Sequence, residues 1–184
     1  MIEPTKQSSK IIALLTDFGT SDPYVGLMKA AIYERCPDAT VIDLTHSIEP
    51  FNIAEGAAVL FMSYRYLPQR SIIVGVVDPG VGSSRRAIVI KSRRYIFVGP
   101  DNGLLTLAAE DDGVEEVREI TNENLFRKPV SRSFHGRDIF APVAAALACG
   151  TLLSEVGSRL DFSIIARPPI RIGFEELGEE CIRL

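Results

Sequence analysis

The sequence contains no tryptophan, two histidines and three cysteines among its 184 residues. The cysteines, Cys36, Cys149 and Cys181, are too few and too widely spaced for a disulfide framework or a zinc knuckle. Cys36 and Cys149 lie in apolar, helical stretches, so we expect both to serve in core packing. Two histidines and scattered aspartates give no compact set of metal ligands. The sequence therefore predicts no metal site.

Charge and hydropathy exclude further classes of protein. The net charge is −4 and no basic block stands out, which argues against a nucleic-acid partner. No apolar run reaches the length of a membrane span, and the polar stretch from Met1 to Lys10 lacks the apolar segment of a signal peptide. A P-loop, a G-x-G-x-x-G motif and a G-x-S-x-G motif are all missing. We therefore expect a cytoplasmic protein with neither a membrane nor a nucleic acid as partner.

What the sequence does contain is an alternation of strand-like and helix-like segments with 46% apolar residues. We expect strands at 11–15, 40–44, 71–77, 87–91, 95–98 and 114–120, and helices at 24–36, 53–64, 104–110 and 139–149. Such alternation is typical of βαβ units. The fold class predicted is α/β, a three-layer sandwich around a central, mostly parallel sheet. We expect a flexible tail at 1–10, one α/β domain at 11–166, and a linker with a short acidic remnant at 167–184.

The stretch from Val76 to Arg86 contains the clearest chemical signal. It follows a buried strand and places Asp78 where that strand would end, at the edge of the sheet where α/β proteins bind ligands. Gly80 lets the backbone approach a ligand closely. Arg85 is near enough to fold back onto Asp78 and hold its carboxylate ionised. A plain β-turn is the competing interpretation, since Asp-Pro-Gly is good turn chemistry.

Polar residues gather at four predicted strand ends or helix starts: Asp17 with Asp22, Asp78 with Arg85, Asp101 with Asn102, and His135 with Arg137 and Asp138. Any one of these could be only a cap or a turn. Because alternate strand ends share one edge of a parallel sheet, we expect all four groups to line one crevice.

Histidines and phenylalanines add candidates for this crevice. His135 stands at a helix start, where the helix dipole disfavours the cation, so a neutral imidazole could orient a water molecule or accept its proton. A hydrogen-bonded turn histidine is the alternative, and loop hydrogen bonding is our default for His46. Phe18, Phe51 and Phe134 could offer flat faces to a purine, although core packing competes for each.

The motifs together resemble a known family. They are Thr16-Asp17-Phe18-Gly19 with Asp22, Asp43-Leu44-Thr45-His46, Asp78-Pro79-Gly80-Val81-Gly82, Gly99-Pro100-Asp101-Asn102-Gly103 and Phe134-His135-Gly136-Arg137-Asp138. In this order, between about residues 11 and 162, they resemble the S-adenosylmethionine (SAM) hydroxide adenosyltransferases, the SAM hydrolases related to fluorinase and chlorinase. The resemblance implies hydrolysis of SAM to adenosine and methionine by water or hydroxide attack at ribose C5′, with SAM as substrate and no cofactor.

The resemblance also implies roles for individual residues. Asp78, Arg85 and His135 match the set that positions and activates the water, and the halogenating relatives carry tyrosine in place of Asp78. Asp17 matches the residue that holds the ribose hydroxyls, and Asp22 one that contacts the methionine end. The other substrate-binding positions implied are Phe51, Gly80, Phe134 and Gly136.

The sequence differs from the pattern of this family at its C-terminal end. Family members carry a β-rich C-terminal domain and form homotrimers whose SAM pocket lies between that domain and a neighbour's N-terminal domain. This chain stops at Leu184, so we expect most of that domain to be missing and turnover to be impaired. The alternatives are a nucleoside- or SAM-binding module, or a subunit that pairs with another chain, in each case without turnover.

Overall fold

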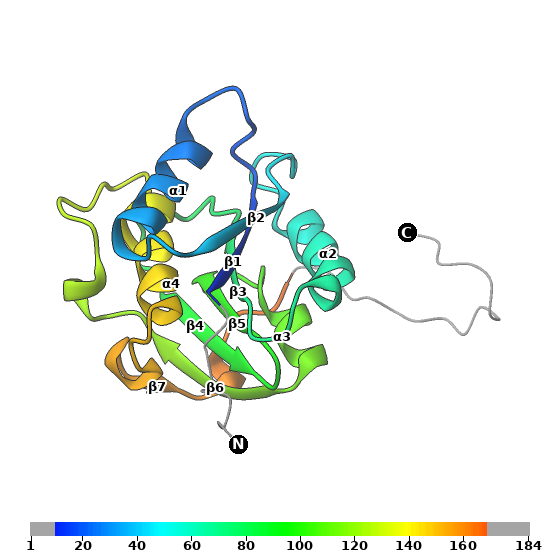
Figure 1. The fold of residues 1–184 in the computed structure, drawn as a ribbon. Coiled ribbons are helices and arrows are strands. Elements are labelled where there is room, and N and C mark those ends of the chain that lie inside the picture. Colours follow the sequence, from blue (N-terminus) through cyan, green and yellow to red (C-terminus); the bar gives the residue numbers. More distant parts are fainter. Residues whose placement is uncertain (1–9, 169–184) are drawn as a thin grey trace, which may run out of the picture.

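A seven-stranded sheet forms the centre of the molecule, seen here in a computed structural model that describes residues 10–168 (Figure 1). Its strand order is β2-β1-β3-β5-β4-β6-β7. The strands are β1 (Ile11–Thr16), β2 (Thr40–Thr45), β3 (Ile72–Val76), β4 (Ala87–Ser92), β5 (Ile96–Pro100), β6 (Val114–Glu119) and β7 (Arg159–Leu160). All six predicted strands are present, and the two-residue β7 is an addition that pairs with β6.

The predicted parallel centre of the sheet is confirmed. β1 pairs in parallel with β2 and β3, and β3 pairs in parallel with β5. The other half is antiparallel, because β4 and β5 form a hairpin and β6 runs antiparallel to β4. β1 is buried on both faces: Ile12 and Leu14 belong to one core, while Ala13 and Leu15 belong to the other. That burial explains its unbroken apolar run.

Helices cover the two faces of the sheet and complete the three predicted layers (Figure 1). One core contains residues of α1 (Tyr24–Arg35) and α4 (Ala141–Ala148), and the other contains residues of α2 (Ile53–Ser63) and α3 (Thr106–Asp112). Every residue of α4 is buried. Five of its eight residues are alanine, and such small side chains let the helix lie close to its neighbours. None of the described helices is long and apolar enough to cross a bilayer.

The expectation that Cys36 and Cys149 serve only in core packing is wrong. They form a disulfide with a Cα–Cα distance of 5.8 Å, and Cys149 is exposed rather than buried. The reason is the packing of α1 against α4, since Cys36 directly follows α1 and Cys149 directly follows α4. Because two of the three cysteines form a disulfide, the low cysteine content no longer argues for a reducing compartment.

The predicted N-terminal tail and the predicted C-terminal linker lie mostly outside the described residues. Residues 1–9 of the predicted tail and residues 169–184 of the predicted linker lie outside the described residues. The described C-terminal residues, Arg167 and Pro168, pack onto Gly103, where an added Cβ would lie 2.6 Å from their backbone atoms. The chain therefore remains in contact with the α/β domain up to residue 168.

Candidate active site

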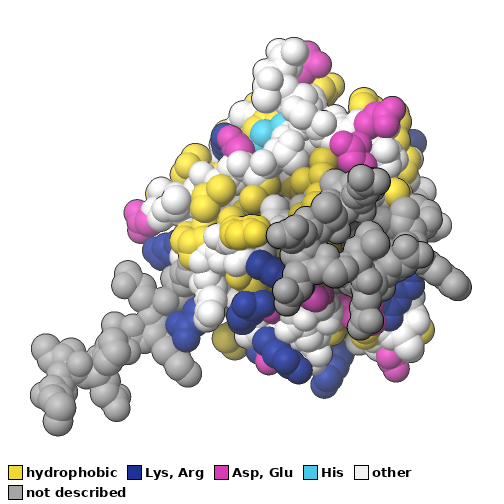
Figure 2. Space-filling view, turned by 90° about the vertical axis from the view of Figure 1, so that its right-hand side faces the viewer, with side chains coloured by type: hydrophobic (Ala, Val, Ile, Leu, Met, Phe, Trp, Pro, Cys, Tyr) yellow, Lys and Arg dark blue, Asp and Glu magenta, His cyan; other side chains and the backbone are white. Residues whose placement is uncertain are grey.

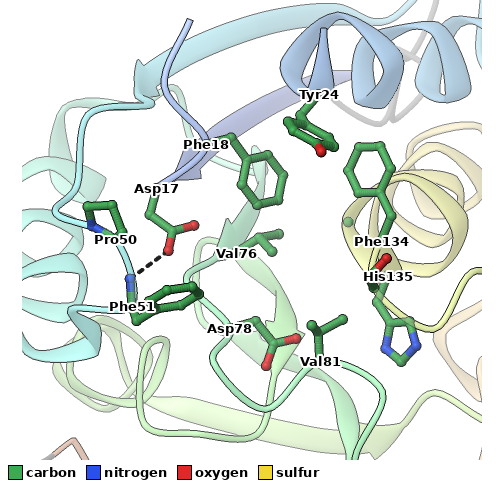
Figure 3. A pocket seen from close by; sticks show the side chains of 12 residues that line it. Asp17, Phe18, Tyr24, Pro50, Phe51, Val76, Asp78, Val81, Phe134 and His135 are labelled. Atoms are coloured by element: carbon green, nitrogen blue, oxygen red, sulfur yellow. Dashed lines mark hydrogen bonds between the residues drawn. The ribbon is translucent and has the colours of Figure 1, made fainter. Parts of the chain in front are cut away.

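A cavity of about 360 Å³ lies at the carboxyl ends of β1 and β3. It is lined by Asp17, Phe18, Tyr24, Pro50, Phe51, Val76, Asp78, Val81, Ser133, Phe134, His135 and Gly136. In the strand order 2-1-3, chain connections leave β1 and β3 in opposite directions, which opens a crevice between their ends. In Figure 3, Asp17 and Phe51 stand on one side of the cavity, and Phe134 and His135 stand on the other.

Asp78, Arg85 and His135, which the family resemblance grouped together, meet beside this cavity. Arg85 Nε lies 3.0 Å from both Asp78 carboxylate oxygens, and its Nη2 lies 2.5 Å from Asp78 Oδ2. The same Nη2 lies 2.8 Å from His135 Nδ1. The side chains of Asp78 and Arg85 are 4% and 11% exposed, so water screens this ion pair only weakly. One guanidinium thus fixes a carboxylate and an imidazole that are 57 residues apart in sequence, from position 78 to position 135.

The surroundings of His135 favour the neutral form of its imidazole. Burial lowers the pKa of its imidazole, and the adjacent Arg85 guanidinium lowers it further, while Asp78 and Asp138 oppose these effects only partly. The sequence predicted a neutral imidazole for a different reason, the dipole of a following helix. The element that follows is η3 (Gly136–Phe140), one turn of π-helix that runs directly into α4. Such turns are frequent at functional sites.

Asp17 and Phe51 form the side of the cavity opposite His135. The backbone N–H of Phe51 donates to Asp17 Oδ2 at 2.8 Å. Phe51 has a φ of 66°, a left-handed conformation that costs a non-glycine residue on the order of 1–3 kcal/mol and clusters at ligand sites. Its side chain is 66% exposed, so this phenylalanine does not serve core packing.

Three aromatic rings form a further wall. Phe134 packs edge-on against Phe18 and Tyr24, with ring centroids 5.8 Å and 5.1 Å apart. Gly136 lies close to this packing, since an added Cβ would be 3.4 Å from the Phe18 ring and 3.2 Å from Met28 Sδ. The aromatic wall and the Asp17 side together form a slot with apolar faces and a polar end.

Tyr24 is a lining residue that the sequence reasoning missed. The sequence placed it only at the start of a predicted helix, but the residue is 46% exposed and faces the cavity (Figure 3). The useful signal was its place in the first turn of α1, directly after the loop that carries Asp17. Pro50, Val81 and Ser133 were missed as well, since each lies in an irregular segment.

The expectation that all four polar groups line one crevice is wrong for the group of Asp101 and Asn102. Asp101 has a structural role, because its carboxylate accepts hydrogen bonds from Arg86 and from the backbone N–H of Ala166. Asn102 donates to the carbonyl of Val77. Neither residue lines the cavity.

The group around His135 is divided, because His135 lines the cavity whereas Arg137 and Asp138 do not. Asp138 is completely buried, binds Arg137 through both carboxylate oxygens and accepts the backbone N–H of Ser131. Buried carboxylates need such partners, which explains why these polar residues support loops and do not face ligand.

Two further predicted residues lie outside the lining. Asp22 is exposed on the loop before α1, and Gly80 sits in the turn behind Arg85, with an added Cβ 3.4 Å from Arg85 Cγ. Their proposed roles in substrate binding stay predictions. Among residues 10–168, no three His, Cys, Asp or Glu side chains gather into a set that could hold a metal ion.

Comparison with known proteins identifies the family. Residues 12–157 match the model of the SAM hydroxide adenosyltransferase N-terminal domain, which is most of the chain. The chain belongs to the SAM hydroxide adenosyltransferase family. The motifs quoted from the sequence therefore indicated the correct family, and the α/β fold agrees with it.

Several relatives of this family member carry informative names. The (R)-S-adenosyl-L-methionine hydrolase of Salinispora tropica is 43% identical over 86% of this chain and 61% of its own length. The enzyme of that name from Methanocaldococcus jannaschii is 47% identical over 74% of this chain and 52% of its own length. A fluorinase from Actinopolyspora mzabensis is more distant, at 29% identity over 88% of this chain and 62% of the relative. The chain thus spans about three fifths of the curated relatives it matches.

Solved structures share the fold. An uncharacterized conserved protein from Thermotoga maritima superposes with a TM-score of 0.79 at 50% identity, over 81% of this chain and 58% of that protein. A conserved hypothetical protein from Thermus thermophilus gives a TM-score of 0.75 at 37% identity, over 88% of this chain and 63% of that protein.

Proposed function

We propose that this chain contributes the water-activating site of a SAM hydrolase, which converts SAM and water to adenosine and methionine. The observation that carries the proposal is the contact of Asp78, Arg85 and His135 beside a cavity large enough to hold a nucleoside. The names of the relatives support SAM as the substrate. Asp78 favours hydrolysis over halogenation, as the resemblance implies.

Proton transfer follows from the donors and acceptors in this cluster. A guanidinium only donates hydrogen bonds, so His135 Nδ1 must be the acceptor in its contact with Arg85. The neutral imidazole then carries its proton on Nε2, which can donate to a water oxygen but cannot take a proton from it. The Asp78 carboxylate has lone pairs beyond those that face Arg85. We therefore assign Asp78 as the proton acceptor and His135 as the group that orients the water.

The reaction then balances in one displacement. The water oxygen forms a bond to ribose C5′ while the C5′–S bond breaks. The electron pair of the broken C5′–S bond stays on sulfur, which neutralises the sulfonium as methionine leaves. The proton of the attacking water passes to Asp78. Because the sulfonium is a good leaving group, the site contributes mainly by aligning the water, which can supply several kcal/mol.

Substrate placement uses the rest of the cavity. Asp17 retains acceptor capacity beyond its bond to the Phe51 N–H, and a carboxylate suits the two hydroxyls of a ribose. The rings of Phe18 and Phe134 offer the apolar walls that a nucleoside needs. We assign Phe51, Gly80, Gly136 and the exposed Asp22 to the surroundings of the same ligand.

Adenosine release from SAM in water enriched with ¹⁸O tests the proposal. We expect the label in the 5′-hydroxyl of adenosine, because attack at C5′ puts the water oxygen there. Asp78→Asn should lower the rate by about 10²- to 10⁴-fold, the usual contribution of a general base. Asp38→Asn is the matched control, since that side chain is 82% exposed. Label in any other product, or full activity of Asp78→Asn, would refute the mechanism.

A second candidate is a nucleoside- or SAM-binding module without turnover. The observation in its favour is that the chain spans about three fifths of the length of its curated relatives. Calorimetric binding of adenosine without release of adenosine from SAM would support this candidate.

We also propose a homotrimer as the assembly. Large hydrophobic side chains that are exposed on the described chain include Phe51, Met62 and Tyr66. Figure 2 shows hydrophobic side chains gathered on one face of the molecule, which supports a protein partner there. Analytical ultracentrifugation tests the trimer, and a single monomeric species at micromolar concentration would contradict it.

A further inference from the structure

A buried histidine outside the catalytic cluster contacts the loop that carries Asp17. His46 directly follows β2 and is 6% exposed. Its Nδ1 lies 2.9 Å from the hydroxyl of Thr16, the last residue of β1. Its Nε2 lies 3.0 Å from Asp43 Oδ1, within ion-pair distance, although Nε2 has no well-aligned hydrogen-bond partner among the described residues. The imidazole thus stands between a carboxylate and a hydroxyl.

The carboxylate end of this arrangement is charged. Burial raises the pKa of Asp43, but the neighbouring Lys29 ammonium and His46 imidazole outweigh it and bring the pKa below its ordinary value. Lys29 Nζ lies 2.6 Å from Asp43 Oδ2. An ionised carboxylate beside Nε2 favours a proton on that nitrogen. In the neutral tautomer with this proton, Nδ1 carries a lone pair and accepts a hydrogen bond from the Thr16 hydroxyl.

The hydroxyl end of the arrangement holds the turn after β1. Thr16 Oγ1 accepts the backbone N–H of Phe18 at 3.2 Å. The carbonyl of His46 accepts the N–H of Gly19 at 2.7 Å, where Gly19 has a left-handed φ of 67°. His46 therefore fixes this turn twice, through its backbone and through the Thr16 hydroxyl. Asp17 and Phe18, which line the cavity, lie within the part that is fixed.

We propose that His46 is a positioning residue, which acts through Thr16 to aim the Asp17 carboxylate at the ribose hydroxyls of the ligand. This inference rests on the proposed function, because it needs Asp17 to hold the ribose. His46 itself is not among the residues that line the cavity, so its effect must pass through the turn.

Comparison of adenosine with 2′,3′-dideoxyadenosine tests the inference, since the second ligand lacks the hydroxyls that Asp17 would bind. Thr16→Val keeps the shape of the side chain and removes its hydroxyl, whereas Thr16→Ser keeps the hydroxyl. In calorimetric titrations, Thr16→Val and His46→Leu should weaken adenosine binding by up to about tenfold, the effect of one net hydrogen bond. Binding of dideoxyadenosine should not change, and Thr16→Ser should restore adenosine binding.

The outcomes separate this inference from the proposed function. If Asp17→Asn abolishes the preference for adenosine but Thr16→Val and His46→Leu do not reduce it, the positioning role is refuted and the role of Asp17 stands. If Thr16→Val weakens the binding of adenosine and dideoxyadenosine equally, the substitution has a general structural effect, and the positioning role is also refuted. A wild-type protein that binds the two nucleosides equally overturns the ribose-binding role of Asp17 together with this inference, whereas the proposed hydrolysis is tested separately by the ¹⁸O experiment.

Discussion

Reduction of the disulfide between Cys36 and Cys149 should destabilise the protein substantially. The two residues are separated by 113 positions, so the bond closes a loop that includes most of the described chain. In the chain-entropy model, closing a loop of about 100 residues contributes about 4.7 kcal/mol at 25 °C by constraining the unfolded state. A domain of this size has a free energy of unfolding of about 5–15 kcal/mol, so the loss is a large fraction of the total.

Urea denaturation with and without a reducing agent measures this loss. With an m-value of about 2 kcal/mol/M, the midpoint should fall by about 2 M on reduction. Because the effect acts on the unfolded state, the far-ultraviolet circular dichroism of the folded protein should not change. The double variant Cys36→Ser/Cys149→Ser is the control, and its midpoint should be low in both conditions.

Thiol counting gives the result that would refute the reasoning. Unreduced, denatured protein should show one free thiol, that of Cys181, because the sequence contains three cysteines. Three free thiols would mean that the bond does not form, despite the Cα–Cα distance of 5.8 Å. One free thiol with equal urea midpoints in both conditions would refute the entropic magnitude instead.

Other predictions concern the site and its supports. Arg85→Gln should raise the pKa of His135, since a neighbouring cation is removed, and an NMR titration of the ring protons measures this; an unchanged pKa would mean that burial alone depresses it. Because the folded pKa of His135 is depressed, the unfolded state binds more protons, and stability should fall as pH drops through about 6.5. Asp138→Ala should cost about 3–5 kcal/mol in urea denaturation by breaking a buried ion pair. Gly82→Ala should destabilise by more than about 1 kcal/mol, since φ is 76° and the new Cβ would lie 2.3 Å from the carbonyl oxygen of Arg132; an unchanged urea midpoint would contradict this.

Local signals in the sequence predicted most of the fold. Apolar runs and helical spacing located six strands and four helices, because burial on one or both faces imposes a period that a single segment displays. The pairing of Asp78 with Arg85 was also predictable, since the two residues are seven positions apart across one turn. The addition of His135 to that pair rested on the family motif, because it comes from a distant part of the chain.

Only the tertiary structure decided which polar residues face the cavity. Asp17 and Asp101 both follow strands of the sheet, yet Asp17 lines the cavity while Asp101 binds Arg86 and the backbone of Ala166. Each aspartate is also followed two positions later by a glycine, Gly19 or Gly103. The difference depends on which distant segment packs beside each turn, and a local pattern contains no information about that.

The same division applies to the two cysteines. The sequence by itself determined that Cys36 follows one helix and Cys149 another, and that both lie in apolar surroundings. Their bond arises because α1 and α4 cover the same face of the sheet and end side by side. A contact across 113 positions is created by the packing of two helices, so its partners become identifiable only when the whole domain has folded.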